Sequence, residues 1–96
     1  MANATGGIIF QPVFDAEIES IAEEDLIIYF NTTGELSVQI EILDANGRSL
    51  LIEDLSLPNG KSTQRLNMSF LSLGQYFIRI SNPYNAVINK QILLIP

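Results

Sequence analysis

The feature that most constrains this fold is a one-by-one alternation of apolar and polar residues. Over residues 36–42 every even position carries Leu, Val or Ile, and every odd position carries Ser, Gln or Glu. The same period returns over residues 14–19 and 76–80, and over 66–70 it places Leu66, Met68 and Phe70 on one face. Successive side chains of a strand point to opposite faces of a sheet, so these segments are typical of half-buried strands. No segment of ten residues follows the helical period, and the chain is predicted to be all-β.

Turn residues separate these segments at intervals of about 8–12 residues, which is typical of a β-sandwich. Asp44-Ala45-Asn46-Gly47 begins with a carboxylate that can accept backbone amides and ends with a glycine that tolerates a positive φ. Asn59-Gly60 is the strongest short hairpin signal, and Asn82-Pro83-Tyr84-Asn85 is typical of a further turn. The sequence therefore predicts an immunoglobulin/fibronectin-like antiparallel sandwich of about seven strands. The apolar run Leu26–Phe30 is expected to be buried on both sides.

A chain of 96 residues is expected to form one domain. Residues 8–96 are assigned to the sandwich. Residues 1–7 are assigned to a flexible leader, because they have neither the basic start nor the apolar stretch of a signal peptide. The longest apolar runs, 26–30 and 92–95, fall far short of the roughly 20 residues that cross a bilayer. Membrane insertion is therefore not expected.

The residues available for chemistry argue against an enzyme. Histidine and cysteine are both absent, so no thiolate nucleophile and no imidazole base exists. Asp15, Glu17 and Glu19 share one face of their strand, and with Glu23–Asp25 nearby they could offer oxygen ligands to calcium. A solvated acidic face that protects an edge strand is the favoured interpretation. The single, widely spaced glycines form no phosphate-binding loop, and no cofactor is expected.

The charge is distributed unevenly. The net charge is −6, which argues against a nucleic-acid partner. Residues 1–54 hold all eleven carboxylates and one arginine, whereas residues 55–96 hold four basic residues and no acid. Pairing of exposed charges across neighbouring strands is the favoured explanation, and a bipolar surface that engages a partner or a second copy is the alternative.

A short motif points to a family. The segment 71–80 has the form L-x-x-G-x-Y-x-x-x-I, in which Gly74 permits a sharp entry into a strand and Tyr76 buries its ring while its hydroxyl bonds a nearby backbone group. Together with Gly47 and Gly60, these two residues are the predicted structural positions. With the preceding strand and turn of residues 40–48, the motif resembles two groups of proteins from Bacteroidetes-type bacteria. One is a family of small exported immunoglobulin-like domains with no assigned function, and the other is the C-terminal sorting domain of the type IX secretion system.

The resemblance covers residues 12–95, and two features order the two families. Sorting domains usually open with a P-N-P motif, from which Gln11-Pro12-Val13-Phe14 departs, whereas the segment 89–93 looks like their basic-then-apolar end. The small exported family is placed first. Both resemblances imply export to the periplasm, the outer membrane surface or the medium. The first implies a non-catalytic binding module for a protein or glycan, and the second implies a sorting and anchoring signal.

Two further surfaces are candidates for contacts. Tyr29, Phe77 and Tyr84 could line an aromatic patch, although core packing or loop anchoring is the favoured role. Val87 to Ile95 is expected at or near a sheet edge, with apolar residues on both faces and Lys90 as its only charge. Such an edge can pair with another chain, so weak self-association through this strand is predicted.

Overall fold

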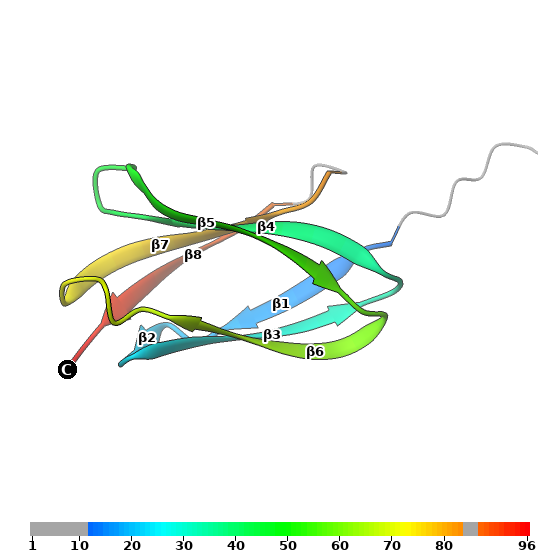
Figure 1. The fold of residues 1–96 in the computed structure, drawn as a ribbon, viewed down its shortest axis with the longest axis horizontal. Helices are drawn as coiled ribbons and strands as arrows, with labels where there is room; N and C mark the ends of the chain where they lie inside the picture. Colours follow the sequence, from blue (N-terminus) through cyan, green and yellow to red (C-terminus); the bar gives the residue numbers. More distant parts are fainter. Residues whose placement is uncertain (1–11, 84–86) are drawn as a thin grey trace, which may run out of the picture.

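The computed structural model describes residues 12–83 and 87–96, which form two β-sheets packed face to face (Figure 1). The three-stranded sheet has the order β1-β3-β6, and the five-stranded sheet has the order β2-β8-β7-β4-β5. The strands are β1 Phe14–Ile18, β2 Ile21–Ala22, β3 Asp25–Thr32, β4 Leu36–Leu43, β5 Ser49–Leu57, β6 Gly60–Asn67, β7 Gly74–Ser81 and β8 Val87–Leu94. The predicted all-β sandwich is confirmed. The described residues hold eight strands, because the short β2 adds one to the expected number.

The core lies between the two sheets and is built from the predicted alternation. In β4, the even positions from 36 to 42 are buried and the odd positions are not. Ile40 lies opposite Ile80 and Ile42 lies opposite Ile78 in the pairing of β4 with β7, and all four are fully buried. Each such aliphatic side chain contributes roughly 1.5–3 kcal/mol when it leaves water, so this double row is a principal source of stability.

Two expectations about burial were wrong. The run Leu26–Phe30 is half-buried, since Leu26, Ile28 and Phe30 face the core while Tyr29 is 47% exposed. The outer face of the three-stranded sheet carries no third layer among the described residues, so a continuous apolar run does not imply burial on both sides here. Phe70 is also exposed, because the chain leaves β6 at Asn67 and the alternation stops there.

The Asn59-Gly60 hairpin is also wrong. β5 pairs with β4, whereas β6 pairs with β3, so these residues carry the chain from one sheet to the other. Gly60 has a φ of +93°, which fits a tight reversal, but this reversal connects a strand of one sheet to a strand of the other. Thr32 is buried at this crossing and donates its hydroxyl hydrogen to the carbonyl oxygen of Pro58.

The C-terminal strand is covered at one end within the domain. β2 pairs in parallel with β8 at Ile21↔Leu93 and Ala22↔Leu94, and the amide of Ile95 donates to the carbonyl of Ala22. Ile92 and Leu94 face the core, while Leu93 is exposed. Self-association through Val87–Ile95 stays a prediction. Because β2 covers the end of β8, only residues 87–91 of this strand remain at the edge of the sheet.

The described residues contain no helix whose length and apolarity would suit a membrane span. The assigned leader, residues 1–7, and Tyr84 lie outside the described residues. Tyr29 and Phe77 lie on the outer faces of opposite sheets, so they do not form one aromatic patch.

Candidate functional site

The turn predicted at residues 44–47 is held by its own aspartate. One carboxylate oxygen of Asp44 accepts the amides of Asn46 and Arg48, each at 2.9 Å, and the other oxygen lies 3.2 Å from Nε of Arg48. The pKa of the Asp44 carboxyl lies below its usual value, chiefly because the carboxylate accepts the amide of Arg48. The amide of Asn46 and the positive charge of Arg48 lower this pKa further. Gly47 closes the turn with a φ of +83°. These contacts serve the turn itself.

The acidic residues singled out in the sequence do not form one site. Asp15 and Glu17 stand on the exposed face of β1, the edge strand of the three-stranded sheet, and Glu19 follows its end. In the part of the chain that the structure describes, no three acidic side chains gather closely enough to hold a metal ion. Arg65 of β6 lies 3.7 Å from Asp25 of β3, an ion pair that joins the acidic and the basic halves of the chain. This pair is the kind of cross-strand contact that the charge distribution favours.

The outer face of the three-stranded sheet carries a shallow groove of about 440 Å³ around Tyr29. The strand register places Asp15, Asn31 and Lys61 side by side in one row across the sheet. The next row holds Glu17, Tyr29 and Thr63 in the same way. An exposed ring flanked by charged and amide groups can stack on a planar or sugar ligand and hydrogen-bond around it.

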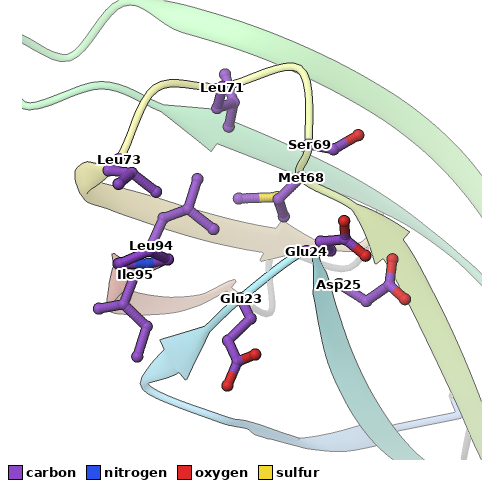
Figure 2. Close-up of a pocket in the computed structure, with 10 residues that line it drawn as sticks. Glu23, Glu24, Asp25, Met68, Ser69, Leu71, Leu73, Leu94 and Ile95 are labelled. Carbon is purple, nitrogen blue, oxygen red and sulfur yellow. The ribbon is translucent and has the colours of Figure 1, made fainter.

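A larger hollow, of about 680 Å³, lies at the end of the sandwich where β2, β8 and the connection from β6 to β7 meet (Figure 2). Apolar side chains line one part of it and carboxylates line the other. The residues that line it are Glu23, Glu24, Asp25, Met68, Ser69, Leu71, Leu73, Leu94, Ile95 and Pro96. Met68 is fully buried, whereas Leu73 is largely exposed at the rim.

The connection from β6 to β7 is shaped by Tyr76 and Gly74. Tyr76 is 8% exposed, and its hydroxyl donates to the carbonyl oxygen of Ser72 at 2.6 Å. Gly74 has a φ of +145°, which L-residues rarely adopt, and apart from Gly74 and its two chain neighbours no described atom lies within 4 Å of the position of an added Cβ. A larger residue there would be limited by backbone strain and not by space. After Met68 the chain makes a single turn, in which the amide of Leu71 donates to the carbonyl of Met68.

Sequence reasoning located Tyr76 and Gly74 but missed the exposed residues around this hollow. Phe70 was counted as part of a strand face, and Ile21 lies in a strand of two residues that is too short to show any period. The signal that could have found the loop is Asn67, whose side-chain oxygen accepts the amide and the hydroxyl of Ser69. An asparagine that bonds the backbone two residues on is typical of a turn, and it ends the strand.

Comparisons with solved structures show the fold alone. A β-glucosidase from Listeria innocua in complex with isofagomine is 12% identical with a TM-score of 0.64, over 88% of this chain and 16% of that chain. The β-glucosidase EmGH1 from Erythrobacter marinus is 12% identical with a TM-score of 0.56, over 88% and 15%. The CARDB domain of the PF1109 protein from Pyrococcus furiosus, in complex with di-metal ions, is 14% identical with a TM-score of 0.54, over 94% and 95%. This chain thus spans about one-sixth of the glucosidase chains.

The family comparison decides between the two resemblances of the sequence. No curated protein matches the chain. The model of a family described as "Secretion system C-terminal sorting domain" matches residues 22–94, from β2 to the last residue of β8. This is the second of the two families that the sequence resembles, so the order given to them from the opening motif is reversed. The chain belongs to the family of secretion system C-terminal sorting domains.

Proposed function

We propose that this domain is the sorting and anchoring signal of an exported protein and is read by the type IX secretion machinery. The family match over residues 22–94 is the observation that carries the proposal, because it covers seven of the eight strands in whole or in part. The resemblance of residues 89–93 to the end of a sorting domain agrees with it. The protein that carries the domain is exported by the secretion system, and we place it at the outer membrane surface or in the medium.

The domain itself performs no chemistry in this proposal. The chain has no histidine and no cysteine, and the carboxylates of β1 stand on an exposed face without a base or nucleophile beside them. A signal of this kind needs a stable fold and a surface that its receptor recognises. In this proposal the chain provides the fold and the recognition surface, and its side chains are unsuited to catalysis.

A fusion experiment tests this function. Residues 1–96 are attached to the C-terminus of a reporter that carries a signal peptide, and the fusion is expressed in a bacterium with a type IX secretion system. We expect the reporter outside the outer membrane in the competent strain and in the periplasm of a strain without the system. The same reporter without the domain is the control. Equal periplasmic retention with and without the domain would refute the proposed function.

A binding module remains the second candidate, because of the groove around Tyr29. Its exposed ring, with Asp15, Asn31 and Lys61 in the adjoining row, suits a glycan better than an apolar peptide. Calorimetric titration with purified outer-membrane polysaccharide tests it. Binding that Tyr29→Ala abolishes and Ile52→Ala preserves would support this role, and no heat of binding at millimolar sugar would exclude it.

A further inference from the structure

One end of the sandwich exposes several large apolar side chains. Nine large hydrophobic residues are exposed among residues 12–83 and 87–96, and four of them lie at this end: Ile21, Phe70, Leu73 and Leu93, each 46–59% exposed. We call these four residues the apolar end. Ile21 and Leu93 are neighbours in the pairing of β2 with β8, and Leu73 and Phe70 lie on the adjoining connection from β6 to β7. Exposed apolar side chains gathered in one place mark an interaction surface more often than single ones do.

The hollow shown in Figure 2 gives this surface its shape. Leu73 stands beside Leu94 and Ile95 at one side of the hollow, Leu71 lies on the connection and Met68 below it, and Glu23 projects from the turn between β2 and β3 on the other side. An apolar side chain of a partner could enter the hollow while its neighbours contact the apolar end. Interfaces commonly place a buried apolar centre inside a polar rim in this way.

The connection that presents Phe70 and Leu73 is held by hydrogen bonds at Met68, Ser69 and Ser72. The amide of Met68 donates to the carbonyl of Glu24 at 2.7 Å, which fastens the connection to the turn between β2 and β3. The side chain of Asn67 accepts from Ser69, and the hydroxyl of Tyr76 donates to Ser72. The connection is therefore ordered in the free domain. Binding of a partner does not carry the entropic cost of ordering it.

The charges at the rim identify the chemistry of the partner. Glu23 and Glu24 are exposed beside the hollow, while Asp25 is paired with Arg65. Two unmatched carboxylates beside an apolar surface suit a protein that presents apolar side chains next to lysines or arginines. A second copy is a poor match, since a symmetric pair places the same surface of both copies in one interface and so brings the carboxylates together. An anionic lipid surface would repel the same carboxylates.

We propose that the apolar end, with the hollow and the Glu23–Glu24 rim, is the surface by which this domain docks onto a protein of the export apparatus with an apolar, positively rimmed site. The inference rests on the proposed sorting function and assigns it to specific side chains. The outer face of the three-stranded sheet is then free of this contact, and that of the five-stranded sheet takes part only at its β2–β8 edge, through Ile21 and Leu93. Recognition uses the end of the sandwich at which β8 finishes.

The test uses the reporter fusion with two sets of variants and matched controls. The apolar set is Phe70→Ser with Leu73→Ser, and its control is Val13→Ser with Ile52→Ser, which removes similarly exposed apolar surface elsewhere. The charge set is Glu23→Lys with Glu24→Lys, and its control is Glu35→Lys, an exposed acid between β3 and β4. Each purified variant is first shown to keep the wild-type circular dichroism spectrum and thermal midpoint.

We expect at least a tenfold loss of exported reporter in the apolar set and in the charge set, and wild-type export in both controls. Wild-type export in all variants would overturn the docking surface and leave the sorting function standing. A wild-type domain that exports no more reporter than the bare reporter would instead refute the sorting function. Two purified-protein results would also overturn the proposal: a dimer in sedimentation that Leu73→Ser abolishes, or binding to anionic phospholipid vesicles that Phe70→Ser abolishes.

Discussion

Removing one oxygen atom, with Tyr76→Phe, tests the connection between β6 and β7 most directly. The ring of Tyr76 is buried and its hydroxyl donates to the carbonyl of Ser72 at 2.6 Å, so the substitution removes one hydrogen bond and leaves the packing unchanged. A buried hydrogen bond contributes about 1–2 kcal/mol when its loss strands a partner. Ser72 is itself exposed, so water can reach its carbonyl, and we expect a cost near the lower end. For a domain of this size, about 1 kcal/mol lowers the melting temperature by about 4–8 °C.

Urea denaturation and a thermal melt measure this cost. The midpoint in urea should fall while the slope stays the same, because the surface exposed on unfolding does not change. Tyr29→Phe is the matched control, since it removes the same atom from an exposed ring. If Tyr76→Phe and Tyr29→Phe both melt with the wild type, the hydroxyl contributes nothing measurable, and the account of a fastened connection fails.

Four other measurements follow from the structure. Gly74→Val should destabilise the domain by more than Tyr76→Phe, because φ there is +145°, and equal midpoints in urea would contradict this. Asp44→Asn should be less stable than the wild type at neutral pH. The difference should shrink as the pH falls below the usual pKa of 3.8 and vanish only below the lower folded pKa of Asp44, where protonation removes its stabilisation. Millimolar calcium should leave the melting temperature unchanged, whereas an ion held at a hundredfold excess over its Kd would add about 2.7 kcal/mol. Sedimentation over a concentration series should show weak self-association that Val87→Lys reduces, and a strictly monomeric wild type would exclude it.

Much of the fold could be predicted because alternation reports directly on how a strand sits between core and water. The expected segment 36–42 lies within β4, and the expected strand from Val87 ends one residue early at Leu94. The turn at Asp44 could be predicted because its chemistry is local: a side chain that bonds amides two and four residues on needs no distant partner.

What could not be predicted depends on contacts between distant segments. An Asn-Gly pair favours a tight reversal, but nothing in four residues says whether the next strand returns to the same sheet or to the opposite one. The run Leu26–Phe30 is apolar throughout, and its outer face is exposed because no described layer covers it, a fact that lies outside the run itself. β2 pairs with β8 through two residues, too few for any period.

The apolar end could not be predicted from the sequence either, because its apolar residues are exposed against the usual expectation. Hydrophobic residues in a sequence are expected inside, so Phe70 is assigned to a strand face with Leu66 and Met68. Folding alone does not require apolar residues at positions 70 and 73. Met68 and Tyr76 are the buried core residues of this region, and polar residues could join β6 to β7. Instead, a connection fastened by Glu24, Asn67 and Tyr76 holds two large apolar side chains in water. Such exposure is unfavourable in the isolated domain, and a partner that covers both side chains removes that cost when it binds. In the proposed docking, the hydrogen bond from the Tyr76 hydroxyl to the carbonyl of Ser72 would serve recognition as well as folding, because it holds the connection next to Leu73.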